Sequence, residues 1–309
     1  MLLPPTPFTR GEAHDLGIRD HQWRELVHDL HVREAYPGLY VDAALADTLQ
    51  LRLAIAERLL TPDLVVARRT SAWLDGLDVL DHRGFPQTPP LEVLTGRQEL
   101  RSKSPLLHTY VADDIQAADL RVMGALQVTT PMRTAADLMR YAPRSDALVV
   151  ADAYLHRDLL SQEVLRKSLV RWRGRRGVRQ AYEIIDLADG RSQSGGESRM
   201  RLRVIDMGLP RPELQIPVLD LFGIERYLLD LGYRRWRLGL EYDGEEFHGP
   251  EHAEHDESRR TWIGGRGWTV RAFRKMHIFT TNQAFETEVM ELVNAARSGG
   301  ATPGYPLSV

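Results

Sequence analysis

The run Arg237-Leu-Gly-Leu-Glu-Tyr-Asp-Gly244 predicts a β-strand that ends at a turn, because apolar residues lead up to Glu241 and a glycine closes the run. A second apolar run, residues 227–233, lies just upstream and carries Asp230. A carboxylate inside an apolar strand is costly to bury unless a partner compensates its charge. If the two runs pair as a hairpin, Asp230 and Glu241 lie side by side.

The carboxylates of these two runs predict a divalent cation site. Glu241 and Asp243 are two residues apart, so in a strand they point to the same face of the sheet. With Asp230 beside them, their shared negative charge needs a cation, and Mg²⁺ or Mn²⁺ takes oxygen ligands of this kind. A cation held by carboxylates is a common means of hydrolysing phosphodiesters. We therefore expect Asp230, Glu241 and Asp243 to be metal ligands.

The composition is that of an ordinary soluble chain. Its 309 residues are enough for two or three domains, with 43% hydrophobic and 27% charged residues. No apolar run approaches a membrane span and no signal-peptide pattern opens the chain, so we expect a cytoplasmic protein without a membrane partner. The absence of cysteine excludes disulfides, thiolate zinc sites and cysteine nucleophiles. The net charge of −3 means that nucleic-acid contacts must come from local basic patches.

Residues 1–60 predict a small winged-helix-like module. A short helix over residues 8–16 ends at Gly17, and Asp20 opens a second helix that reaches residue 30. Pro37-Gly38 then marks a turn between two short extended pieces. Helix, turn, helix and hairpin form a winged helix-turn-helix, whose second helix enters the major groove of DNA. Because that helix carries acidic as well as basic side chains, a packing or protein-contact module is an equal alternative.

Residues 61–186 predict a middle domain of mixed α/β type. A strand over residues 64–67 is followed by a helix that Gly76 closes, and a further strand covers residues 91–94. Residues 126–138 pass from a strand into a helix with Pro131 near its first turn.

The N-terminal module, Ser71-Ala-Trp-Leu-Asp-Gly-Leu77 and Val128-Thr-Thr-Pro-Met-Arg-Thr-Ala-Ala-Asp-Leu138 together resemble the AbiEi-type antitoxin/regulator family over roughly residues 5–160. This resemblance implies a winged-helix regulator fused to an α/β domain, with a toxin or another protein as a candidate partner. Within the second motif, we expect Arg133, Thr134 and Asp137 to fix local packing.

Residues 161–193 are rich in basic side chains. They admit two interpretations, a phosphate-contacting patch and a solvated helix face followed by a loop around Gly174 and Gly177. The side chains concerned are Arg166, Lys167, Arg171, Arg173, Arg175, Arg176 and Arg179.

Residues 192–300 predict an α/β (α+β) domain with the order αβββαβα. Ser194 and Glu197 have the spacing of a capping box at the start of its first helix. A strand near residues 214–221 contains Pro217, which favours a sheet edge or a bulge. The strands with Asp230 and Glu241 follow, then a polar helix over residues 251–265, a strand over 268–273 and a last helix over 281–297.

This order resembles the very-short-patch-repair-like branch of the PD-(D/E)XK, or restriction-endonuclease-like, nuclease superfamily. The resemblance covers about residues 192–297. The matching motifs are Glu197-Ser-Arg-Met-Arg, Gly208-Leu-Pro, Asp230, Glu241-Tyr-Asp-Gly, His248, Asp256 with Arg259-Arg260, and Gly267-Trp-Thr-Val-Arg.

The resemblance implies a catalytic role for five residues. Asp230 matches the metal-binding aspartate, Glu241 the second acidic ligand, and Glu197 a helix-borne acid that completes the site or orients a metal-bound water. The superfamily's usual lysine is replaced by Asp243, which either binds a second cation or holds the turn before Gly244. His248 is a candidate general acid or base, against the alternative of a surface histidine.

A nuclease also needs basic side chains to accept DNA. The candidates are Arg199, Arg201, Arg203, Arg234, Arg235 and Arg237, together with Arg259 and Arg260. The last two either contact phosphate or form a structural ion pair with Asp256.

Two functions follow as hypotheses. The first is a metal-dependent endonuclease that hydrolyses DNA and is guided by the N-terminal module. The second is a non-catalytic, antitoxin-like regulator or DNA- or protein-binding chain whose nuclease fold only binds, which the missing lysine favours.

Overall fold

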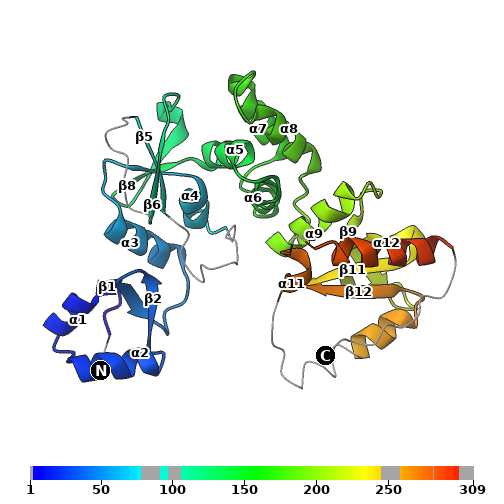
Figure 1. Cartoon of the computed structure of the whole chain (residues 1–309), viewed down its shortest axis with the longest axis horizontal. Coiled ribbons are helices and arrows are strands. Elements are labelled where there is room, and N and C mark those ends of the chain that lie inside the picture. The colour runs from blue at the N-terminus through cyan, green and yellow to red at the C-terminus, as the bar shows by residue number, and fades with distance from the viewer. Residues whose placement is uncertain (1–2, 78–90, 97–105, 245–257, 281, 299–309) are drawn as a thin grey trace. The chain divides into compact units, whose positions relative to one another are not determined.

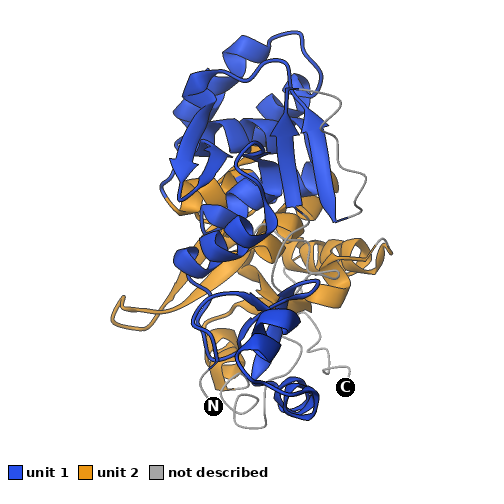
Figure 2. Cartoon of the chain, turned by 90° about the vertical axis from the view of Figure 1, so that its left-hand side faces the viewer, with its two compact units in different colours: residues 1–150, 158–186 blue, residues 151–157, 187–309 orange. Residues whose placement is uncertain are grey.

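The structure is a computed structural model of the chain and describes residues 3–77, 91–96, 106–244, 258–280 and 282–298 (Figure 1). Two compact units make up the chain: unit 1 is Met1–Val150 with Asp158–Asp186, and unit 2 is Ala151–Arg157 with Leu187–Val309 (Figure 2). Unit 1 contains the predicted domain 1–60 and most of the predicted domain 61–186, whose residues 151–157 belong to unit 2. Each unit combines helices with β-sheet, which confirms the mixed α/β class. No helix in the described ranges has the length and apolar character needed to cross a membrane.

The N-terminal part of unit 1 is built on a three-stranded antiparallel sheet in the order β1-β3-β2. Its elements are β1 (Phe8–Thr9), α1 (Arg10–Asp15), α2 (Asp20–His28), β2 (Val32–Tyr36) and β3 (Leu39–Asp42). The prediction that the first helix begins at Phe8 was wrong, because Phe8 pairs with Tyr40 in the sheet. Thr9 then caps α1 in a capping box with Glu12. Trp23 packs edge-on against Tyr40 and anchors α2 to the sheet.

A five-stranded sheet in the order β6-β5-β4-β8-β7 forms the rest of the unit 1 core. Its strands are β4 (Val65–Val66), β5 (Leu91–Thr95), β6 (Leu107–Val111), β7 (Leu120–Met123) and β8 (Leu126–Thr129). The helices are α3 (Leu49–Leu59), α4 (Arg68–Leu74), α5 (Pro131–Tyr141), α6 (Arg144–His156), α7 (Gln162–Ser168) and α8 (Val178–Leu187), with 3₁₀ turns η2 (Ala117–Asp119) and η3 (Leu169–Trp172). Thr130 caps α5 with Pro131 in its first turn, which confirms the predicted passage from strand to helix.

The apolar core of unit 1 joins the sheet to α3 and α4. Ile55, Trp73, Val93 and Val128 are all at most 3% exposed and belong to one cluster. Burying a large apolar side chain of this kind contributes about 1.5–3 kcal/mol. The apolar spacing of these segments therefore accounts for how the helices lie on the sheet.

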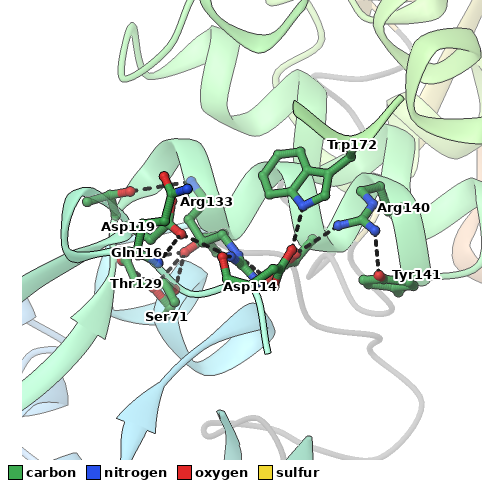
Figure 3. A network of polar contacts seen from close by, with 12 residues as sticks. Ser71, Asp114, Gln116, Asp119, Thr129, Arg133, Arg140, Tyr141 and Trp172 are labelled. Atoms are coloured by element: carbon green, nitrogen blue, oxygen red, sulfur yellow. Dashed lines mark hydrogen bonds and ion pairs between the residues drawn. The ribbon is translucent and has the colours of Figure 1, made fainter. Parts of the chain in front are cut away.

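A buried polar network centred on Arg133 holds the start of α5 (Figure 3). The Arg133 side chain, 3% exposed, donates to Asp137 (2.8 Å), Asp119 (3.0 Å) and Asp114 (2.9 Å). Next to it, the Thr134 hydroxyl lies 2.6 Å from that of Thr129. Buried charges persist in proteins when they are paired in this way. The expected packing role of Arg133, Thr134 and Asp137 is confirmed.

Unit 2 is a four-stranded sheet in the order β12-β11-β10-β9. Its elements are α9 (Gly195–Asp206), β9 (Glu213–Leu219), β10 (Glu225–Tyr233), a 3₁₀ turn η4 (Arg234–Trp236), β11 (Leu238–Asp243), β12 (Thr269–Arg274), α11 (Lys275–Ile278) and α12 (Ala284–Arg297). Residues 258–264 are also helical. Neighbouring strands β9, β10 and β11 are antiparallel, and β12 is parallel to β11. Pro217 lies in the edge strand β9, as predicted.

The core of unit 2 lies where α9 and α12 pack against the sheet. Leu231 and Leu240 from β10 and β11 are fully buried with Phe273 of β12, and α12 adds Phe285 and Val289. The Phe273 and Phe285 rings meet edge-to-face with their centroids 4.8 Å apart. This core fixes the helix start and the two strands that carry the predicted acidic residues.

Candidate active site

Asp230 and Glu241 lie on adjacent strands of unit 2. Strands β10 and β11 pair antiparallel with Leu231 opposite Leu240, so Asp230 and Glu241 follow as the next facing residues in that register. The backbone N–H of Tyr242 donates to Asp230 Oδ2 at 2.8 Å, which fixes this carboxylate at the strand pair. The predicted hairpin that brings the two acids together is therefore confirmed.

Glu197 reaches the same strands from the first turn of α9. The helix contacts both β10 and β11, and its second residue is Gly196. A Cβ atom on Gly196 would overlap the ring of Tyr242 on β11, so only glycine permits this close approach. Glu197, which is 6% exposed, follows directly. The helix start thus places the buried carboxylate of Glu197 beside the strand pair.

The capping alternative explains the backbone of Glu197 but not its carboxylate. The Ser194 side chain accepts from the Glu197 N–H, as an N-cap does. In a full capping box the Glu197 side chain would bond the N–H of Ser194. Instead its Oε2 accepts from the N–H of Gln193 at 2.9 Å and from Gln215 Nε2 at 3.3 Å. Gln215 thereby joins this carboxylate to strand β9.

The three carboxylates influence one another electrostatically. Burial raises the pKa of Asp230 to about 7, and the negative charges of Glu197 and Glu241 add to this effect. Burial also raises the pKa of Glu197, against the hydrogen bonds that it accepts from Gln193 and Ser194. The site therefore concentrates negative charge. When Asp230 is ionised, neighbouring positive groups do not fully balance this charge. A bound cation would supply the missing positive charge.

Arg259 compensates part of this charge at Glu241. Its Nη2 and Nη1 donate to Glu241 Oε1 and Oε2 at 2.5 and 2.9 Å, which is a bidentate pair. The guanidinium also lies 5.3 Å from the centroid of the Tyr227 ring. Arg259 was predicted either to contact phosphate or to form an ion pair with Asp256. The structure shows an ion pair, but its partner is Glu241. Asp256 and His248 lie outside the described residues.

The carboxylates of this site are suitable ligands for a hard cation, but arginine side chains already interact with two of them. Carboxylate oxygens of Asp230, Glu241 and Asp243 are the ligand type that Mg²⁺ prefers. The Arg259 pair occupies both oxygens of Glu241, and Arg274 Nε lies 3.9 Å from Asp243 Oδ2. Within the described ranges, no three His, Asp or Glu side chains form a group that is already arranged around a metal position. Metal binding would therefore require Arg259 to share or release Glu241.

Two predicted basic-rim residues have structural roles instead. Arg203 donates to both oxygens of Glu286 at 2.6 Å and to backbone carbonyls that include His277 at 2.8 Å, so it joins α9 to α12. Arg201 is 4% exposed and pairs with Asp152 at 2.6 Å. Both guanidinium groups are used within the fold. The predicted phosphate contact of Arg203 and the rim position of Arg201 are corrected accordingly.

The other predicted rim residues lie at or near the surface. Arg235 is exposed and stacks on Trp236, and Arg199 lies 5.0 Å from the ring of Phe279. Arg260 is half-buried in the helix at residues 258–264. The remaining two are held by neighbours: Arg234 pairs with Glu213 at 2.8 Å, and Arg237 donates to the Arg266 carbonyl at 2.5 Å.

Substituting Gly196 by alanine should displace the start of α9. The added methyl group overlaps the Tyr242 ring, and overpacking of this kind costs about 1–3 kcal/mol. We expect that loss in the free energy of unfolding, measured by urea denaturation. Gly264→Ala is the matched control in the same unit, because a Cβ there meets no atom within 4 Å. Equal stability of the wild type and Gly196→Ala would refute the close approach of α9 to β11.

Comparison with known proteins places the chain within a family. The class defined so far is a mixed α/β protein in which two carboxylates of one sheet, Asp230 and Glu241, lie near a third from helix α9, Glu197. No family model matches the chain. Two uncharacterized proteins of Mycobacterium tuberculosis, MT2308 of strain CDC 1551 / Oshkosh and Rv2248 of strain ATCC 25618 / H37Rv, are each 33% identical to it over 234 residues. The match covers 75% of this chain and 82% of each relative, so the chain belongs to their family.

Proposed function

We propose that unit 2 is a metal-dependent endonuclease domain that hydrolyses phosphodiester bonds in DNA. The observation that carries the proposal is that Asp230 and Glu241 face each other on β10 and β11 and that Glu197 of α9 is close enough for its charge to act on Asp230. The strand order β12-β11-β10-β9, with β11 and β12 parallel and the other pairs antiparallel, further supports it. The order of helices and strands along unit 2 also agrees with the order on which the restriction-endonuclease-like resemblance rests.

In this proposal Asp230 and Glu241 hold Mg²⁺ or Mn²⁺, with Asp243 as a further oxygen donor on the same strand. A bound cation polarises the scissile phosphate and lowers the pKa of a coordinated water. Glu197, whose carboxylate accepts hydrogen bonds from Gln193 and Gln215, would orient the attacking water. Arg259 turns from Glu241 to a phosphate oxygen, for which a guanidinium is well suited.

The N-terminal part of unit 1 is proposed as a winged-helix module that guides unit 2 to DNA. Helices α1 and α2 precede the β2–β3 hairpin, which is the order of such a module. On α2, the side chains of His21, Arg24 and His28 are exposed and available to DNA. Asp20, at the start of the same helix, pairs with Arg10 at 2.9 Å, which reduces its repulsion of phosphate.

A second candidate function is a non-catalytic regulator that binds DNA or a protein toxin. Two observations at the site favour it. Both oxygens of Glu241 already accept hydrogen bonds from Arg259. Asp243 stands where the resembling nucleases have a lysine, so a group that stabilises charge on the phosphate is missing from that position.

A plasmid-nicking assay separates the two functions. We expect the wild type to nick supercoiled DNA in millimolar Mg²⁺ or Mn²⁺ and to be inactive in EDTA. Asp230→Asn should reduce the rate at least about 100-fold, because it removes a charged ligand. Glu225→Gln, an exposed acid on the same strand, is the control and should keep full activity. Cleavage that survives Asp230→Asn would refute the endonuclease, and DNA binding without cleavage in any metal would favour the regulator.

A further inference from the structure

Unit 1 contains a cavity of about 1000 Å³ that the proposed nuclease chemistry does not use. Residues from the start of α4, the end of β6, the second half of α5 and the loop before α8 line it. Its walls include Arg68, Tyr110, Arg140, Tyr141, Arg175 and Arg176. A concave site of this volume is large enough for a ligand of drug or nucleotide size.

Arg68 is held in an unusual conformation at this cavity. Its φ of +49° lies in the left-handed region, which a non-glycine residue adopts only at a cost of about 1–3 kcal/mol. The guanidinium carbon lies 3.4 Å from the centroid of the Tyr110 ring. The Tyr110 hydroxyl in turn donates a hydrogen bond to Glu92 Oε1 at 2.9 Å. Arg68 Nε is buried and has no hydrogen-bond partner in the part of the chain that the structure describes. A strained arginine whose buried Nε has no hydrogen-bond partner among the described residues points to a ligand that completes its bonding.

The loop that carries Arg175 and Arg176 is docked in a fixed position. Arg140 Nε and Nη2 both donate to the Arg176 carbonyl at 3.3 Å. Gly177 has a φ of +80°, and a Cβ there would overlap the Arg140 carbonyl, so the loop packs directly on the end of α5. The side chains of Arg175 and Arg176 are nevertheless exposed at the cavity. The backbone is therefore preorganised while both guanidinium groups remain accessible.

The charges that line the cavity leave an excess of positive charge. Arg133 is committed to Asp114, Asp119 and Asp137. By contrast, Arg68, Arg175 and Arg176 form no ion pair with any residue in the described ranges. Guanidinium groups bind phosphate oxygens in bidentate geometry. The cavity therefore offers three arginines to an anion.

Acceptor groups beside these arginines indicate what else the ligand carries. Asp113 and Asp137 line the same cavity. Asp137 Oδ1 is buried and accepts no hydrogen bond from the described residues, although Arg140 Nη1 lies 3.6 Å away. Such oxygens suit hydroxyl or amino donors on a ligand.

We propose that this cavity binds a small phosphorylated molecule of the nucleotide kind. Its phosphate contacts Arg68, Arg175 and Arg176, and its polar part donates to Asp137. A phosphate of the DNA backbone has the same chemistry as the ligand's phosphate group. The cavity volume of about 1000 Å³ suits a ligand of nucleotide size, which favours the small molecule over a DNA strand.

The test is calorimetric titration of the full chain with ATP, inorganic phosphate and a short DNA duplex, all in EDTA. We expect ATP to bind the wild type, and Arg175→Gln/Arg176→Gln to weaken that binding at least about tenfold. Arg173→Gln is the matched control, because Arg173 is an exposed arginine of the same loop outside the cavity lining. Its affinity for ATP should stay within about twofold of the wild type.

Two results would overturn the proposal. One is the absence of heat from ATP and phosphate with the wild type at about 1 mM ligand. The other is duplex binding that the double substitution weakens while ATP and phosphate do not bind, which would assign the arginines to DNA. Because cleavage is measured in Mg²⁺ and ATP binding in EDTA, failure of either proposal is distinguishable from failure of the other.

Discussion

Replacing Asp230 with asparagine is expected to stabilise the metal-free protein at pH 8 by about 2–4 kcal/mol. In the fold, burial and the charges of Glu197 and Glu241 raise the pKa of Asp230 from 3.8 to about 7. Each unit of such a shift corresponds to about 1.4 kcal/mol. Asparagine removes the charge and keeps an oxygen that accepts the Tyr242 N–H.

The sign of this effect depends on pH. A raised pKa means that the folded protein holds the Asp230 proton more tightly than the unfolded chain does. The stabilising contribution of the protonated Asp230 is therefore complete below pH 3.8 and is lost as the pH rises from there through about 7. The advantage of Asp230→Asn should be absent near pH 3.8 and greatest above pH 7.

Urea denaturation of both proteins across this pH range, in EDTA, measures the difference. Glu225→Gln on the same strand is the control, because its exposed side chain should change stability by no more than about 0.5 kcal/mol. A difference between wild type and Asp230→Asn that does not vary with pH would contradict the shared negative charge of the three acids.

Replacing Arg133 with methionine is expected to destabilise unit 1 by about 3–5 kcal/mol. The substitution leaves Asp137 buried without its hydrogen-bonded cation and removes one partner each from Asp114 and Asp119. Arg171 keeps two hydrogen bonds to Asp119, so Asp137 suffers the greater loss. Methionine fills a similar volume, so the loss should come mainly from the unpaired carboxylate.

Thermal and urea denaturation measure this loss in the free energy of unfolding. A second substitution, at Asp137, tests whether the loss comes from the Arg133–Asp137 pair. Arg133→Met/Asp137→Asn should be less destabilised than the sum of the two single variants, because both partners of one pair are removed. Arg166→Met is the control, since Arg166 forms only an exposed pair with Asp186. Additive effects of the two substitutions would show that the pair is not a unit.

Local sequence patterns predicted the elements that carry the acids. Two apolar runs and the glycine at 244 placed Asp230 and Glu241 on adjacent strands, as β10 and β11 show. In unit 1, Pro131 marked the start of α5. These signals are short-range, because a turn or a cap is determined by a few neighbouring residues.

Tertiary contacts explain what the sequence did not predict. The Arg259–Glu241 pair joins residues 18 positions apart that meet only through the fold. For Arg201 a signal was present, because it shares helical spacing with the buried residues Glu197, Met200 and Val204. The charge of Arg201 alone predicts a place in a DNA-binding rim, whereas its helical spacing predicts burial, and the side chain is 4% exposed. In a similar way, the second glycine of the Ser194-Gly-Gly-Glu197 run signalled the close approach of α9 to Tyr242.

The most direct test of the endonuclease proposal is calorimetric titration of Mn²⁺ into the wild type and into Asp230→Ala/Glu241→Ala, each with and without a DNA duplex. The duplex matters because its phosphate can complete the shell of the cation. We expect Mn²⁺ to bind the wild type, more tightly when DNA is present, and not to bind the double variant. Absence of Mn²⁺ binding to the wild type even with DNA present, or equal binding to both proteins, would contradict a metal site at Asp230 and Glu241.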